Sequence, residues 1–146
     1  MLYDILQDEE FAVILKNHAI DIITYLFEKN QEFGVLVEIS SVTFEPELPK
    51  NIYEQLPEFT LFLLMNYTYE SARLEEGKLV FEAGFGAENF GSVVTVPIEA
   101  VLQIIVDETP IFVNLTASLA KKQQPKNSME ALLSNPENRK FLKKEE

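Results

Sequence analysis

The chain has 146 residues, of which 47% are hydrophobic, and its formal net charge is -12 at pH 7. This length suits one domain with one hydrophobic core, and the acidic charge argues against nucleic acid and anionic membranes as partners, and against an RNA-binding small barrel. The sequence has no cysteine, which excludes disulfides, thiolate nucleophiles and thiolate metal ligands. The charge is uneven, because residues 121–146 hold seven Lys or Arg and four Glu. That segment carries +3 and the preceding residues carry -15.

The segment from Asp8 to Lys29 is predicted to form a helix. Its first residues are acidic, as favours a helix N-terminus. Apolar side chains cover more of this helix than one face, whereas an ordinary surface helix buries a single face. We expect one face to pack on its own domain and the other to form a homodimer, through Phe11, Leu15, Ile22 and Leu26. The alternative is a helix buried deep in one core.

Several strands are expected after this helix. Gly34 is a candidate left-handed cap for the helix. Partial alternation from Val35 to Phe44 predicts a strand with one solvent-exposed face, and Phe59 to Tyr67, apolar on both sides, predicts a central strand. Lys78 to Phe85 alternates clearly, with one face made by Leu79, Phe81, Ala83 and Phe85.

The next segments complete the expected fold. Residues 86–91 are predicted to form a hairpin loop, and Ser92 to Val96 the returning strand. Because the fixed φ of Pro97 suits a first helical turn, Ile98 to Val106 is predicted to be a short helix. Ile111 to Leu115 is predicted to be a last strand. The fold class is therefore α+β: an N-terminal helix, then a small, strongly bent antiparallel sheet or partial barrel with one short helix after the fourth strand.

The composition changes near Ala120. Residues 1–119 are expected to form the domain and residues 120–146 a flexible tail, since Lys121 to Ser128 is polar like a linker. The tail ends with two apolar residues between four cations, Arg139, Lys140, Phe141, Leu142, Lys143 and Lys144.

No catalytic or metal-binding constellation is recognised. His18 is the only histidine, so we expect it to be partly buried in the core or an interface rather than to bind a metal or activate a serine. The acidic pairs Glu75-Glu76 and Asp107-Glu108 lack the spacing of a calcium loop and are interpreted as solvated charge. We therefore expect no enzyme activity, no metal and no cofactor; an enzyme using one of these carboxylate pairs is an alternative.

The glycines of residues 84–86 do not form a dinucleotide-binding motif, because a strand and not a helix follows their loop. One interpretation is a tight or bulged hairpin. The other is that Gly84 and Gly86 allow a second backbone, that of an extended peptide, to approach closely.

Three motifs carry a family resemblance. Residues 81–87, 94–97 and 100–105 read FEAGFGA, VTVP and AVLQII. They resemble the pattern of the stringent starvation protein B family, F-x-A-R-F-G-G, V-x-V-P and A-V-L-x-I-Y, and the resemblance runs from about Ile22 to Val113. Gly84 stands where the family has arginine, Ala87 where it has a second glycine, and Ile105 where it has tyrosine.

The resemblance implies a dimeric adaptor of the ClpXP protease with a bent β-sheet domain. Such adaptors hold the C-terminal degradation tag (ssrA-like) of stalled-translation products, and their tail docks on the N-terminal domain of ClpX. Carried over by position, the implied peptide-binding residues are Ala83, Gly84, Phe85, Gly86 and Ala87, with Tyr53 and Phe112 as walls. The implied docking residues are those from Arg139 to Lys144.

We therefore expect a non-enzymatic, cytoplasmic adaptor with tagged proteins and ClpX as partners. The cytoplasmic location rests on an N-terminus without the basic region of a signal peptide and on apolar runs too short to span a bilayer. Because Gly84 and Ala87 depart from the family pattern, a peptide-binding module of the same fold with a different protein cargo is the alternative.

Overall fold

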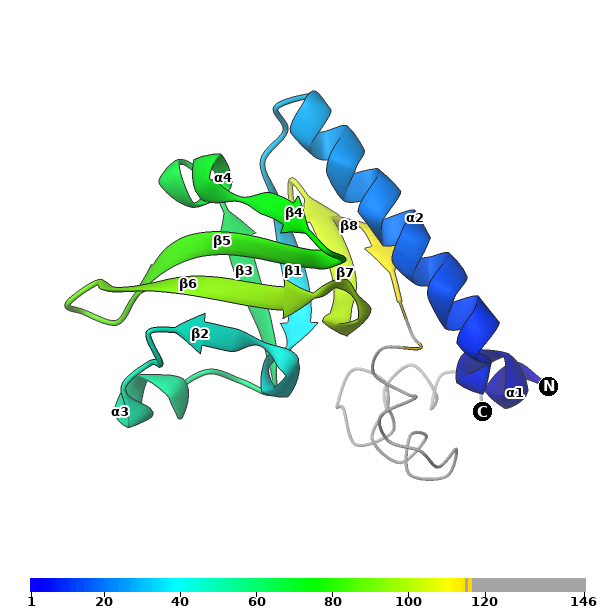
Figure 1. Cartoon of the computed structure of the whole chain (residues 1–146), viewed down its shortest axis with the longest axis horizontal. Coiled ribbons are helices and arrows are strands. Elements are labelled where there is room, and N and C mark those ends of the chain that lie inside the picture. Colours follow the sequence, from blue (N-terminus) through cyan, green and yellow to red (C-terminus); the bar gives the residue numbers. More distant parts are fainter. Residues whose placement is uncertain (115, 117–146) are drawn as a thin grey trace, which may run out of the picture.

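The computed structural model describes residues 1–114 and 116, and Figure 1 shows the arrangement of their helices and strands. In this part of the chain the elements are α1 (Leu2–Gln7), α2 (Glu9–Glu28), β1 (Phe33–Glu38), η1 (Ile39–Ser41), β2 (Thr43–Glu45), α3 (Lys50–Tyr53), β3 (Phe59–Leu64), α4 (Tyr67–Ser71), β4 (Arg73–Glu75), β5 (Lys78–Phe85), β6 (Phe90–Pro97), η2 (Ile98–Ala100), β7 (Val101–Val106) and β8 (Thr109–Val113). The predictions for residues 120–146 lie outside the described residues.

The described strands form two four-stranded antiparallel sheets. The first sheet has the order β3-β1-β7-β8 and the second the order β2-β6-β5-β4. The α+β class and the N-terminal helix are thus confirmed, and the strands do not close into a barrel. The described helices include none that is both long enough and apolar enough to cross a membrane.

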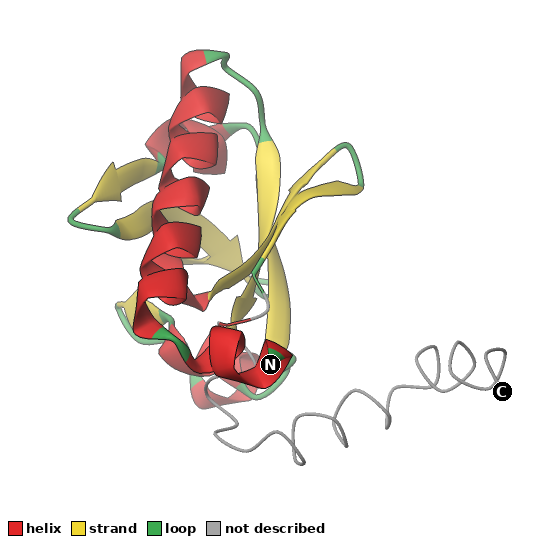
Figure 2. Ribbon diagram, turned by 90° about the vertical axis from the view of Figure 1, so that its right-hand side faces the viewer, coloured by secondary structure: helices red, strands yellow, loops and turns green. Residues whose placement is uncertain are grey.

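Helix α2 occupies the predicted segment. Asp8 is its N-cap, and the Asp8 carboxylate accepts a hydrogen bond from the backbone N–H of Glu10 at 2.9 Å, which satisfies one of the free donors of the first turn. The helix runs along one side of the sheets (Figure 2) and buries Ala19, Ile23 and Leu26 in the core. The short helix α1 that precedes it was not predicted.

Four phenylalanine rings join the two sheets. Phe62 of the first sheet meets Phe81 of the second at 5.5 Å between ring centroids, and Phe85 at 6.3 Å. Phe44 of β2 lies 5.6 Å from Phe85. Phe81 is fully buried, and with Leu79 it confirms the predicted inward face of β5. The rings of these pairs are tilted or edge-on, an arrangement that aromatic side chains favour.

The helix predicted for Ile98 to Val106 is wrong. Only Ile98–Ala100 is helical, as the single turn η2, and the chain then enters the first sheet as β7. Val101, Ile104 and Val106 are β-branched and fit a strand between two neighbours better than a helix. Pro97 ends β6 with ψ 135° instead of starting a helix.

The strand predicted for Val35 to Phe44 is two strands. β1 and β2 belong to different sheets, and η1 makes the change of direction between them. β1 is the central strand here, paired with β3 and β7, and even Glu38 on its expected polar side is buried. Gly34 is not a helix cap: it lies within β1, and Asn30 takes the positive φ after α2.

Phe59 to Tyr67 is not a central strand. β3 is the edge of the first sheet, and its residues alternate between exposed and buried. Phe59, Leu61 and Leu63 are among the exposed large apolar side chains. The sequence pattern was apolar on both sides because one side forms the core and the other forms an apolar outer surface.

Candidate functional site

A cleft of about 520 Å³ lies beside the β5–β6 hairpin, and we call it the hairpin cleft. It is lined by residues 45–46 at the end of β2, 65–68 from the end of β3 into α4, 82–84 of β5, 91–93 of β6, and Asn89 of the hairpin loop. The hairpin projects from the sheets on the side of the molecule away from α2 (Figure 1). Met65 and Tyr67 form an apolar, largely exposed part of the cleft's rim, at 47% and 63% exposure.

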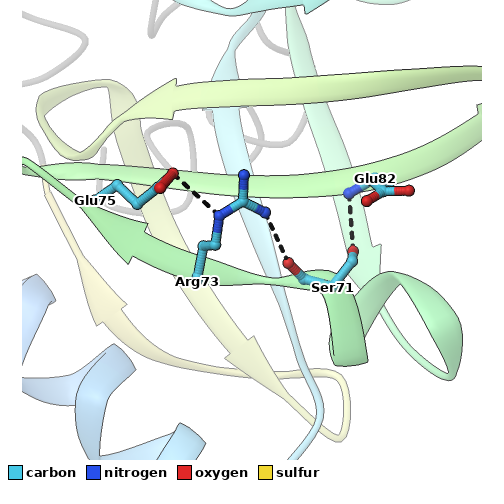
Figure 3. Close-up of polar contacts among 4 residues, drawn as sticks. All are labelled: Ser71, Arg73, Glu75 and Glu82. Atoms are coloured by element: carbon cyan, nitrogen blue, oxygen red, sulfur yellow. Dashed lines mark hydrogen bonds and ion pairs between the residues drawn. The ribbon is translucent and has the colours of Figure 1, made fainter.

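One wall of the hairpin cleft, α4, is held against β5 by polar contacts. The Tyr67 hydroxyl donates to the Glu82 carboxylate at 2.8 Å. The backbone N–H of Glu82 donates to Oγ of Ser71 at 2.9 Å (Figure 3). Arg73 donates to the backbone oxygen of Ser71 at 3.2 Å and pairs with Glu75 at 3.0 Å (Figure 3). The wall is therefore tied to β5 through both the main chain and the side chain of Glu82.

Two further contacts lie at the start of α4 and at the end of β2. Asn66 adopts the left-handed φ of 54°, which asparagine tolerates better than most residues, and its N–H donates to Glu32 at 2.6 Å. Ser92 donates to the backbone oxygen of Pro46 at 2.9 Å, which joins β6 to the end of β2. These contacts connect the start of α4 to the residue before β1 and the end of β2 to β6 along the hairpin cleft.

The charge of the hairpin cleft is acidic. Glu45 and Glu82 lie among its lining residues, and none of those residues is Lys or Arg. The hydrogen bond to Glu82 raises the pKa of the Tyr67 hydroxyl above its usual 10.0, and the negative charge of Glu82 raises it further. Tyr67 therefore remains a neutral hydrogen-bond donor at neutral pH.

Two glycines face each other in the hairpin cleft. Gly84 of β5 pairs with Gly91 of β6, so this part of the sheet has no side chain on either strand. A Cβ at Gly91 would meet no atom within 4 Å, whereas a Cβ at Gly84 would collide with the carboxamide of Asn89. The outer side of Gly91 is therefore open, whereas the Asn89 side chain covers that of Gly84, so it is the main chain at Gly91 that suits the close approach of another backbone.

The predicted peptide-binding residues divide into two groups. Ala83 and Gly84 line the hairpin cleft, and the loop residue Ala87 is exposed beyond it. Phe85 instead packs its ring against Phe44 and Phe62. Gly86 supplies the positive φ of 75° that the hairpin loop requires.

The two predicted wall residues lie elsewhere. Phe112 is buried in β8, where its ring is 5.7 Å from that of His18. Tyr53 packs edge-on against Phe44 and lines a separate cavity of about 490 Å³ next to β2. Both were assigned by rough position along the chain, which does not determine where a side chain lies in space.

Sequence reasoning missed Met65, Tyr67, Asn89 and Ser92. For Asn89 a local pattern was present, because asparagine in a hairpin loop tolerates the left-handed conformation that it adopts here, with φ 54°. Met65 and Tyr67 were assigned to a strand, so their place on a rim was not recognised. For Ser92 no local pattern marks the contact with Pro46, 46 residues away in the chain.

The acidic pairs that were weighed as cation sites lie in tight turns. Asp107 and Glu108 have φ values of 49° and 67° and connect β7 to β8, while Glu76 and Gly77, with φ of 50° and 76°, connect β4 to β5. Positive φ at both loop residues fits a two-residue hairpin turn. Within residues 1–114 and 116 no group of three His, Asp or Glu side chains is placed to hold a metal ion.

A comparison with protein-family models finds no match to this chain, and a comparison with curated proteins finds none. The interpretation of the hairpin cleft therefore depends on its own geometry and on the sequence motifs.

We predict that Gly84 and Asn89 are energetically coupled. Gly84→Ala should cost about 1 kcal/mol more than Gly91→Ala, because only the first displaces the Asn89 side chain from its rotamer. In a chain that also carries Asn89→Gly, which keeps the positive φ, the two alanine substitutions should reduce the stability equally. Urea unfolding followed by circular dichroism measures the two alanine substitutions, each in the unmodified chain and in the Asn89→Gly chain. Equal losses for the two alanine variants would contradict the contact.

Proposed function

We propose that this protein is a non-enzymatic adaptor that binds the C-terminal degradation tag (ssrA-like) of stalled-translation products and tethers these proteins to ClpXP in the cytoplasm. The observation that carries the proposal is the hairpin cleft beside the Gly84–Gly91 pair. Gly84 lies within the motif that resembles the stringent starvation protein B family, and Gly91 is its partner on β6. A cleft next to exposed main chain at Gly91 suits an extended peptide, which binds through its backbone.

The charge of the cleft limits how the peptide lies. Glu45 and Glu82 would repel the free carboxylate at the end of a tag, and no lining residue offers a cation to neutralise it. The segment inside the cleft is therefore neutral or cationic, and the terminal carboxylate remains outside. The oxygen of the Tyr67 hydroxyl, whose proton is donated to Glu82, can accept a hydrogen bond from the peptide, and the main chain at Gly91 is open to it.

A second candidate keeps the cleft and changes the cargo. Gly84 stands where the family has arginine, and the lining carries acidic residues without a cation. Both observations favour a basic segment of another protein over an acidic one. Comparing a tag peptide with a basic peptide of equal length separates the two candidates.

We predict that a labelled tag peptide binds with a Kd of tens of micromolar or tighter, roughly 6 kcal/mol of binding free energy. Gly91→Val should weaken this binding at least about tenfold, because the added side chain enters the open space of the cleft. The strand should accept valine without loss of stability.

Thr43→Val is the matched control, since Thr43 lies on an exposed position of β2 and lines the other cavity. Fluorescence anisotropy gives the affinities and thermal melting checks the fold. Absence of saturable binding by the unmodified chain would refute the tag-binding proposal. Equal weakening by both valine variants would refute the assignment to the hairpin cleft.

The adaptor is proposed to be a homodimer through α2. Leu26 is buried in the core and cannot contact a second copy, so that member of the predicted interface is wrong. Phe11, Leu15 and Ile22 are half-buried. Ile14 and Tyr25, at 60% and 56% exposure, lie at helical spacing on the same side and extend the apolar face.

We predict that Ile14→Glu shifts the chain toward monomer by placing a charge in the apolar contact. Thr24→Glu, which adds the same charge at an exposed position on another side of α2, should leave the dimer unchanged. Sedimentation equilibrium measures both. A monomeric unmodified chain at micromolar concentration would contradict the dimer.

The tail from Arg139 to Lys144 is proposed to dock on the N-terminal domain of ClpX. Removing residues 138–146 should abolish delivery of a tagged substrate while tag binding persists, because a tether raises the effective concentration of cargo at the protease. A chain with Lys121→Gln and Lys122→Gln, which keeps the end, is the control. Unchanged degradation rates after the truncation would remove the tail from the mechanism.

A further inference from the structure

A further concave surface lies on the outer face of the first sheet, and we call it the sheet groove. Its volume is about 440 Å³, and its centre is the row Leu63, Gly34 and Ile105, paired across β3, β1 and β7. Leu61 and Leu63 lean over Gly34, where a Cβ would come within 3.2 and 3.0 Å of their methyl groups. At 46% and 57% exposure, these leucines present an apolar surface to solvent.

The rim of the sheet groove is acidic. Glu32 lies at the entrance to β1, and the β7–β8 turn places Asp107 and Glu108 on the rim. No Lys or Arg is among the residues that line the groove. An apolar floor with three carboxylates around it is complementary to a short segment with apolar side chains flanked by cations.

We infer that the sheet groove binds the chain's own C-terminal segment, residues 139–144, with Phe141 and Leu142 on the apolar floor and the flanking cations toward Glu32 and the β7–β8 turn. The segment has the required chemistry, two adjacent apolar residues between two pairs of cations. It belongs to the part of the sequence that carries +3, while the domain that would receive it belongs to the part that carries -15.

The chain is long enough for this contact. Between Thr116, the last described residue, and Arg139 lie 22 residues, which span at most about 70 Å when extended. The width of the first sheet from β8 to β3 is three strand spacings, about 14 Å. Attachment in one chain gives the segment a local concentration on the order of millimolar, so even weak binding is populated.

Other occupants fit less well. A second copy placed symmetrically on the same groove would bring two sets of Asp107 and Glu108 together. A degradation tag would bring its terminal carboxylate to the acidic rim, where no lining Lys or Arg neutralises it. Occupancy of the sheet groove would withhold the segment from any external partner, so that partner must compete with the groove.

The absence of cysteine makes a direct test possible in the full-length chain. Glu146→Cys creates a single site for a nitroxide label, whose paramagnetic broadening is read on leucine and isoleucine methyl groups. Leu61, Leu63 and Ile105 should lose most of their intensity, and Leu48, buried outside the groove, should keep it. Combining the label with Phe141→Ser and Leu142→Ser should restore the lost intensity.

A matched pair of charge variants tests the rim. Asp107→Asn with Glu108→Gln should reduce the broadening several-fold, whereas Glu75→Gln with Glu76→Gln, at the β4–β5 turn, should leave it unchanged. Added salt should also reduce the broadening, because it screens the attraction between the cations of the segment and the rim carboxylates.

Three outcomes would overturn the inference. The first is the absence of broadening at the groove, or broadening that survives the loss of Phe141 and Leu142. The second is broadening that persists in a mixture in which one copy of the chain carries the nitroxide and another carries the isotope-labelled methyl groups. That result would mean that the segment in the groove comes from a second copy. The third is displacement of the groove signals by a tag peptide in the Gly91→Val chain, which would assign the groove to cargo.

Discussion

The contact between Phe62 of β3 and Phe81 of β5 is the interaction on which the rest of the structure depends, because it joins the first sheet to the second. Phe44 and Phe85 extend it toward the β5–β6 hairpin. Since the rings lie in the core, the opposite side of the hairpin main chain faces the hairpin cleft. Burial of aromatic side chains therefore sets the position of Gly84 and Gly91, although neither glycine contributes a side chain to the packing.

Polar contacts then determine the shape of the hairpin cleft. The Glu82 carboxylate accepts a hydrogen bond from the Tyr67 hydroxyl, and the Glu82 N–H donates to Oγ of Ser71. Both ends of α4 are therefore hydrogen-bonded to the same residue of β5. Glu32 holds Asn66 at the start of that helix. In the proposed function an extended peptide would lose conformational entropy on binding, and these contacts would reduce the further cost of ordering the cleft. Glu82, which makes two of these contacts, and Glu45 are the carboxylates that line the cleft.

The hairpin cleft and the sheet groove both depend on the position of β3 in the first sheet. As an edge strand it turns one row of apolar side chains to the core and another to solvent, and the chain that continues from it lines the hairpin cleft. An exposed apolar row on an edge strand invites association with another chain. Three acidic residues line the sheet groove, and such a rim is complementary to segments that carry positive charge.

The sequence by itself determined the α+β class, the helix from Asp8 onward and the inward face of β5, because these follow from capping, helical spacing and strict alternation within one element. It also marked Ala83 and Gly84, which the fold places in a cleft. Only the tertiary structure decided that β3 is an edge strand, that residues 101–106 form a strand of the first sheet, and that Phe112 and Leu26 are buried. An apolar pattern indicates that a side chain is buried or clustered, but it does not indicate which neighbour the side chain packs against. Strand order, and contacts between residues 15 to 83 positions apart in the chain, are set by packing of the whole domain.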